Sequence, residues 1–168
     1  MKTLVAYFSK NGENSVNFEV KNINVGHTEM LANKIARLTG GDMYPISAKV
    51  PYSGNYEEVL RRAKQENEDA SFPEIANPLD SIAEYDVIYL GFPNWYRSFP
   101  RIIATFIKSY DFKGKIVKPF CTTEEGTFGL AELELAAMLK DAELKSGFGI
   151  LGKDVEFCDE KLKIWVEK

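Results

Sequence analysis

The chain has 168 residues, of which 45% are apolar, and it carries a formal net charge of −4. This length fits one compact domain, and the apolar content is enough for one buried core without disulfide or metal support. The acidic balance, and the lack of a lysine- and arginine-rich stretch interleaved with aromatic residues, argue against nucleic acid as a partner.

The sequence also argues against a membrane and a metal. The apolar run at residues 4–8 is too short for the core of a signal peptide, and no run approaches the roughly 20 apolar residues of a membrane span. We therefore expect a cytoplasmic protein. Cys121 and Cys158 have no neighbour at metal-binding or redox spacing, so both are interpreted as small buried apolar residues.

Apolar runs of strand length alternate with segments of helical period, which is typical of a parallel sheet covered by helices on both faces. Strands are predicted at residues 4–8, 43–46, 87–92, 115–121 and 143–150. The first helix is predicted between a start signal at residues 26–29 and a stop signal at 40–41. Four more helices are predicted at residues 55–67, from 98 to about 107, at 129–140 and at 159–167.

Apolar residues at helical spacing predict which helix faces point toward the core. In the first helix these are Leu31, Ile35 and Leu38. In the helix at 98–107 they are Ile102, Ile103, Phe106 and Ile107, and in the helix at 129–140 they are Leu130, Leu133 and Ala137.

One segment interrupts the alternation of strands and helices. Between Gly12 and Gly26, apolar residues alternate with polar ones on both sides of the pair Lys21-Asn22. This pattern predicts a β-hairpin over about residues 13–25, inserted in the loop after the first strand. We expect the hairpin to lie near whatever that loop binds.

Three loops follow predicted strands, at the sheet edge where open parallel sheets bind ligands. The second loop, 91–96, contains two large rings and an amide, and the third, 121–129, is polar and contains glycine. The first loop enters a helix N-terminus, where free N–H groups and the helix dipole favour a phosphate. Its hydrogen-bonding residues are Ser9, Asn11, Gly12, His27 and Thr28. Together the loops fit a phosphorylated planar ring, and this fit points to flavin mononucleotide (FMN).

Two segments of the chain resemble a known family, the short-chain flavodoxin-like proteins. The subgroup with a Phe-Pro-Asn-Trp loop and a Pro-Phe-Cys-Thr strand end is matched at residues 92–95 and 119–122. The resemblance runs from Thr3 to about Asp154. It implies an α/β, flavodoxin-like three-layer sandwich with a five-stranded parallel sheet in the order 2-1-3-4-5, forming one domain over residues 1–168. It also implies noncovalently bound FMN.

The resemblance implies a role for each loop at the FMN site. Ser9, Asn11, Gly12, His27 and Thr28 would form the phosphate loop. One wall of the ring site would be formed by Pro93, Asn94, Trp95 and Tyr96, and the opposite loop would contribute Thr122, Glu124, Gly126 and Phe128. Two features depart from the subgroup: the hairpin splits the phosphate loop, and His27 stands where the subgroup often has asparagine.

Several of these residues also have a purely structural interpretation. Trp95 and Tyr96 are also consistent with a surface-packed pair or a subunit contact, so a homodimer stays open, and His27 with a helix cap. Cys121 is interpreted as a buried residue, not a catalytic thiol, because no base or basic neighbour accompanies it. No catalytic residue is assigned.

Three functions agree with the sequence. The favoured one is an FMN-binding electron-transfer protein with a redox protein as partner. The close alternative is an FMN-dependent quinone reductase that takes hydride from NAD(P)H, and the third is a non-catalytic flavin-binding sensor or interaction module. Two features would separate these three functions: how much of the bound flavin is exposed, and which part of the site the hairpin covers. Neither feature can be predicted from the sequence.

Overall fold

The computed structural model describes all 168 residues. Its central sheet is parallel, in the order β4 (Asp42–Pro45), β1 (Thr3–Tyr7), β5 (Val87–Pro93), β6 (Ile116–Thr123), and then β7 (Glu143–Leu144) and β8 (Phe148–Leu151) along one edge. The predicted order 2-1-3-4-5 is confirmed. The strand predicted at 143–150 is divided into β7 and β8, which both pair with β6.

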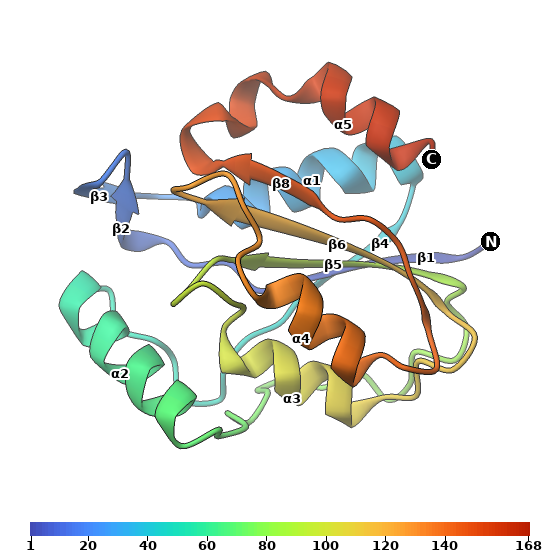
Figure 1. Cartoon of the computed structure of the whole chain (residues 1–168), viewed down its shortest axis with the longest axis horizontal. Helices are drawn as coiled ribbons and strands as arrows, with labels where there is room; N and C mark the ends of the chain where they lie inside the picture. The colour runs from blue at the N-terminus through green and yellow to red at the C-terminus, as the bar shows by residue number, and fades with distance from the viewer.

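Helices cover both faces of the sheet (Figure 1). On one face lie α1 (His27–Thr39), the short 3₁₀ helix η1 (Gly152–Phe157) and α5 (Asp159–Val166); on the other lie α3 (Arg101–Ser109) and α4 (Ala131–Met138). The remaining helix, α2 (Tyr56–Glu68), is capped by the Asn55 side chain and extends past the strand ends. None of the helices has the length and apolarity needed to cross a membrane.

The core is densest where β5 passes β6. All residues of β5 except the last are buried, as its unbroken apolar run predicts. Gly91 lies directly under the ring of Phe120, and a Cβ at this glycine would be 2.1 Å from the ring. A glycine is therefore required in the middle of this strand, where it would otherwise weaken the sheet.

The structure confirms the predicted inward face of α3 and contradicts that of α4. Ile102 and Phe106 are fully buried in α3. In α4, Leu133 is 73% exposed, while Leu135 is fully buried. The apolar residues of this helix are spread around its axis, so their spacing did not define one inward face. Just before the helix, the Leu130 N–H donates to the Arg97 carbonyl at 2.6 Å. The predicted burial of Leu38 is also wrong, because this residue near the end of α1 is 45% exposed.

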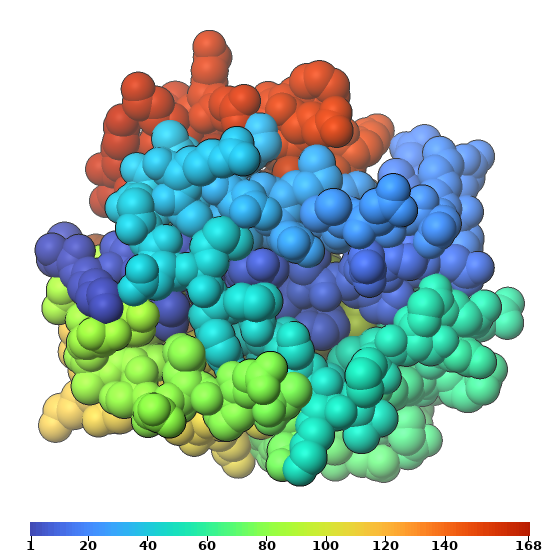
Figure 2. All heavy atoms as spheres, turned by 180° about the vertical axis from the view of Figure 1, so that it is seen from behind, coloured from blue at the N-terminus to red at the C-terminus, as the bar shows by residue number.

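A β-hairpin separates β1 from α1. It consists of β2 (Gly12–Val16) and β3 (Glu19–Ile23), which pair only with each other. The view from behind shows the hairpin and α2 at the same end of the molecule, on either side of the segment that follows β1 (Figure 2). The hairpin therefore adds a wall at the carboxyl ends of the strands without joining the main sheet.

Candidate functional site

A cavity of about 310 Å³ opens at the carboxyl ends of β1, β5 and β6. This is the edge at which open parallel sheets bind ligands. The cavity brings together nine residues predicted from the sequence: Ser9, His27, Thr28, Pro93, Asn94, Trp95, Tyr96, Thr122 and Glu124. All three predicted loops therefore contribute to one site.

Four predicted site residues do not line this cavity. Asn11 is exposed, and Gly12 begins β2 next to the carbonyl of Gly54. Gly126 forms a turn with a positive φ of 77°, in the loop after β6. Phe128 is buried, and its ring packs against that of Phe92 with the centroids 6.0 Å apart.

The N-terminus of α1 faces the cavity and is open to an anion. Ser9 Oγ accepts a hydrogen bond from the Glu29 N–H at 3.0 Å. The N–H groups of His27 and Thr28 have no protein acceptor, and together with the helix dipole they favour a negatively charged ligand. Gly26, at the N-cap, permits this geometry, because a Cβ there would lie 2.1 Å from Ser9 Oγ.

Gly26 therefore occupies the place that the sequence analysis gave to Gly12. The hairpin separates the two glycines, and Gly26 is the one that stands next to the helix. The sequence signal for this role of Gly26 is that it immediately precedes His27 and Thr28. A glycine just before the first helical residue is also where a close backbone approach is expected.

The first and third loops are joined by two buried hydroxyl groups. Thr28 Oγ1 lies 2.7 Å from Thr122 Oγ1, and both residues are at least nine-tenths buried. When Thr122 is the donor, the hydroxyl proton of Thr28 is free to point into the cavity. The pair thus connects the helix N-terminus to the end of β6.

His27 sits in a space that a glycine keeps open. A Cβ at Gly152 would lie 2.2 Å from His27 Nδ1, so no larger residue fits there without moving the imidazole. Burial lowers the pKa of His27 below its ordinary value, and the charges of Glu124 and Glu156 oppose this. The imidazole is therefore neutral at pH 7. Gly152 was missed by the sequence analysis because it is distant in the chain.

Trp95 forms a fixed aromatic wall. Its indole makes edge-to-face contacts with the rings of Phe8 and Tyr52, with centroids 5.4 and 5.3 Å away. The ring of Tyr52 is held in turn by the guanidinium of Arg62, 3.8 Å from its centroid. Trp95 is only half-buried and lines the cavity, so part of the indole stays available to a ligand.

Tyr96 is placed by a tight turn of unusual backbone geometry. Trp95 and Ser98 exchange both backbone hydrogen bonds, and the two residues between them, Tyr96 and Arg97, have positive φ of 51° and 64°. The Tyr96 hydroxyl donates to the carbonyl of Leu60 in α2 at 2.9 Å. The turn therefore aims the phenol ring across the cavity mouth.

The predicted hairpin does lie at the site, although none of its lining residues was named from the sequence. The wall formed by the apolar face of α2 and the contribution of Lys10 were not predicted. The lining residues that were not predicted are Lys10, Glu13, Asn14, Ser15, Phe18, Tyr56, Val59, Leu60, Ala63, Thr123 and Gly152. No local pattern marks them, because their place in the site depends on contacts between distant parts of the chain.

Two glutamates fasten the hairpin over the cavity. Glu13 Oε2 accepts hydrogen bonds from the Tyr56 N–H at 2.8 Å and from Asn55 Nδ2 at 3.2 Å, at the N-terminus of α2. At the hairpin tip, Glu124 Oε2 accepts from the Phe18 N–H at 2.7 Å and from Ser15 Oγ at 3.3 Å. Both sides of the hairpin are therefore tied to the rest of the site by carboxylates.

Comparisons with known proteins agree with this geometry. The family model for flavodoxin matches residues 2–168. The chain belongs to the flavodoxin family. No curated protein matches this flavodoxin-family chain.

Solved structures resemble this flavodoxin-family protein over most of its length. Two are described as a "putative flavoprotein". The one from Bacteroides uniformis ATCC 8492 is 33% identical, with 99% of this chain and 98% of that chain covered and a TM-score of 0.78. The one from Bacteroides eggerthii DSM 20697 is 29% identical, covering 96% and 97%, with a TM-score of 0.72. A flavoprotein in complex with FMN from Lactobacillus acidophilus NCFM shares the fold at 20% identity, covering 92% and 96%, with a TM-score of 0.66.

The residues around the cavity fit FMN. Free N–H groups at the N-terminus of α1 suit a phosphate, and the Trp95 indole that lines the cavity suits a planar ring. Membership of the flavodoxin family and this set of donors together support FMN as the cofactor.

Proposed function

We propose that this flavodoxin-family protein binds FMN and transfers electrons to or from a redox partner protein. One observation carries the proposal. The N-terminus of α1, whose first N–H groups have no protein acceptor, opens into a cavity with an aromatic wall at the ends of β1, β5 and β6. When bound, FMN would supply the redox chemistry, and the protein would supply binding, orientation and charge.

Each loop of the site would have a distinct task in this function. The N–H groups of His27 and Thr28 would hold the phosphate, and Trp95 would stack against the ring. The β5–α3 loop is braced by Asn94, whose N–H donates to the Thr122 carbonyl at 2.8 Å. This bond fixes the aromatic wall relative to the end of β6.

The size of the cavity favours electron transfer over nucleotide-dependent reduction. At about 310 Å³ it lies at the lower limit of ordinary small-molecule sites, which run from about 300 to 1,000 Å³. One flavin would fill it. The hairpin and α2 line the flanks of the cavity, which leaves little room beside the flavin for a second large ligand such as a nicotinamide nucleotide.

One observation favours an FMN-dependent NAD(P)H quinone reductase as the second candidate. The Phe18 side chain is 75% exposed at the hairpin tip and Tyr96 is 46% exposed, and both line the mouth of the cavity. Two exposed rings at a mouth are suited to a small planar acceptor, which would stack on them.

Two measurements test the proposal. First, protein purified under native conditions is expected to be yellow and to release one FMN per chain on denaturation. Apo-protein that does not quench FMN fluorescence contradicts the cofactor assignment. Second, anaerobic stopped-flow mixing with NADH or NADPH is expected to reduce the bound flavin only slowly. Rapid bleaching that saturates with nucleotide concentration identifies a reductase instead.

A further inference from the structure

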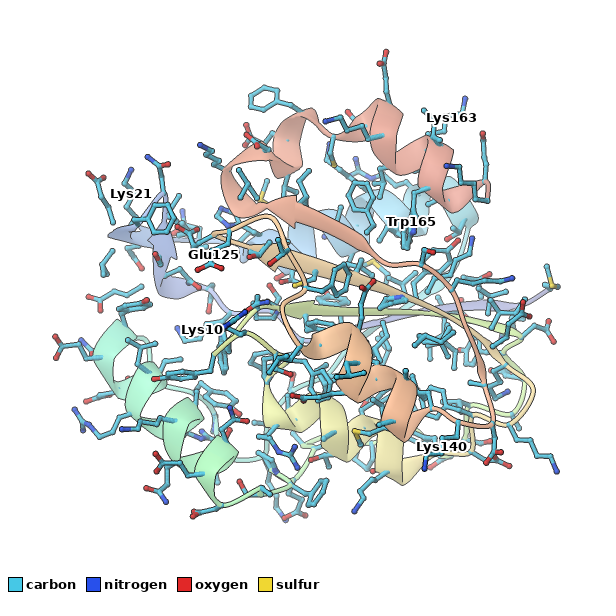
Figure 3. The ribbon with its side chains drawn as sticks, viewed as in Figure 1. Lys10, Lys21, Glu125, Lys140, Lys163 and Trp165 are labelled. Atoms are coloured by element: carbon cyan, nitrogen blue, oxygen red, sulfur yellow. The ribbon has the colours of Figure 1, made fainter.

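Lys10 is a buried cation whose charge the protein does not neutralise. It follows Ser9 in the loop after β1, lines the cavity and is only 9% exposed. Its Nζ donates to the neighbouring Asn11 carbonyl at 2.6 Å and makes no ion pair with a carboxylate. Figure 3 shows Lys10 between the strand ends and α2, inside the end of the molecule that carries the hairpin.

The surrounding loop is organised around this lysine. Asn14 Nδ2 donates to the carbonyls of Lys10 and Gly12, at 3.1 and 3.2 Å. Gly12 packs against the ammonium group, since a Cβ there would lie 3.3 Å from Lys10 Nζ. The entry into the hairpin therefore packs against one side of the lysine and leaves the other side to the cavity.

A buried ammonium without a counter-charge is costly, and the single hydrogen bond to the Asn11 carbonyl relieves only part of this cost. Burial lowers the pKa of Lys10, and the charge of Glu13 opposes that effect without pairing with the amine. An anion in the cavity would supply the missing charge. The anion site at the N-terminus of α1 belongs to the same cavity, because Lys10, His27 and Thr28 all line it.

We propose that Lys10 is a cationic contact for the phosphate monoester of the bound ligand, adding a full positive charge to the partial charge of the α1 N-terminus. The inference rests on the proposed FMN binding and goes beyond it, because it assigns the charge recognition to a residue of the split loop. In this proposal the entry into the hairpin also has a function, which is to bury Lys10 on one side.

The test compares FMN with riboflavin, which lacks the phosphate. Dissociation constants for both are measured by fluorescence quenching with wild-type protein and with Lys10→Met, Lys10→Arg and Lys153→Met. Lys153 is the matched control: it is exposed, its Nζ lies 3.4 Å from Asn17 Oδ1 at the hairpin tip, and its substitution removes the same charge. We expect Lys10→Met to weaken FMN about ten- to hundredfold and riboflavin only slightly. Lys10→Arg is expected to retain most of the affinity, and Lys153→Met all of it.

Melting of the apo-protein distinguishes ligand recognition from a structural role. Removal of an unneutralised buried charge is expected to raise the melting temperature of Lys10→Met above that of wild type. A lower melting temperature, or equal weakening of FMN and riboflavin, overturns the inference.

Inorganic phosphate separates this inference from the proposed function. Wild-type protein that binds neither flavin contradicts the proposed function alone. Lys10 is then tested by the rise in melting temperature that inorganic phosphate causes in wild type, Lys10→Met and Lys153→Met. A rise that is lost in Lys10→Met and kept in Lys153→Met supports the anion contact. An equal rise in all three proteins overturns it.

Discussion

The hydroxyl oxygens of Thr28 and Thr122 are 2.7 Å apart, although the residues are separated by 94 positions in the chain. This bond joins the first turn of α1 to the end of β6 inside the cavity. Replacing either threonine by valine leaves the other hydroxyl buried without a partner, at a cost of about 1–3 kcal/mol in the free energy of unfolding. The double variant removes both hydroxyls, so it is expected to lose less than the sum of the single losses. Urea unfolding measures the three differences, and strict additivity would show that the hydroxyls do not interact.

The same pair predicts a difference between ligands. If the Thr28 proton points to a phosphate, Thr28→Val weakens FMN about ten- to hundredfold and riboflavin far less. Thr39→Val is the control, because its hydroxyl donates to the Ile35 carbonyl near the other end of α1 and does not line the cavity. Calorimetric titration of both flavins checks this, and an equal loss for FMN and riboflavin would mark Thr28 as a structural residue.

Substitution of Gly152 is expected to displace His27. A Cβ at this position would lie 2.2 Å from Nδ1, so Gly152→Ala must push the imidazole out of place. We expect weaker FMN binding from Gly152→Ala, and partial recovery when His27→Ala is added, because the collision is then removed. Gly54→Ala is a suitable control, since a Cβ there meets no atom within 4 Å. Failure of the second substitution to restore any affinity would place the effect of Gly152 in the backbone.

His27 predicts a loss of stability on acidification. Its pKa in the folded protein lies below the ordinary value of 6.5, so the unfolded chain binds the proton first as the pH falls. The free energy of unfolding contributed by neutral His27 is therefore retained above pH 6.5. It decreases as the pH falls from 6.5 toward the lower folded pKa, with a slope of at most about 1.4 kcal/mol per unit. His27→Asn is expected to lack this component, which urea unfolding of apo-protein between about pH 5 and 8 can measure. Identical pH profiles for the two proteins would contradict the burial of the neutral imidazole.

Glu124 is expected to hold the hairpin closed. Its carboxylate accepts the Phe18 N–H at 2.7 Å, and hydrogen bonds to charged groups contribute about 1.5–3 kcal/mol. Glu124→Ala should therefore increase hydrogen exchange in β2 and β3 and speed FMN release, without changing exchange in the central sheet. Glu125→Ala is the matched control, because this neighbouring carboxylate is exposed and accepts no hydrogen bond from the hairpin. Unchanged exchange at the hairpin in Glu124→Ala would show that other contacts hold it.

The strands of the sheet and the three loops could be predicted because their determinants are local, whereas the order of the strands was implied by the resemblance to flavodoxin-like proteins. A continuous apolar run such as β5 identifies a strand buried on both faces, and loops after such strands necessarily meet at one edge. The rotation of α4 could not be predicted in this way. Its apolar residues are spread around the axis, and the residue before the helix, Leu130, bonds to Arg97, which is a neighbour only after folding.

Several lining residues of the site were missed for a related reason. Glu13 reads as an ordinary polar residue of a hairpin, and its role appears only when its carboxylate meets the Tyr56 N–H. Lys10 reads as a solvated lysine, and only the enclosing hairpin buries it. Gly12 was assigned to the phosphate loop and Gly26 only to the helix start, whereas the structure places Gly26 directly against Ser9 at the N-cap of α1.

The two tight turns at the cavity mouth imply a limit on how far this protein can be made heat-resistant. Phe18 and Tyr96 each occupy a turn position with positive φ, 62° and 51°, where a residue other than glycine costs of order 1–3 kcal/mol. Glycine at either position would relieve this strain, and selection for heat resistance alone would favour it. The same exchange would remove a ring from the mouth, so stability gained there would be lost from ligand recognition.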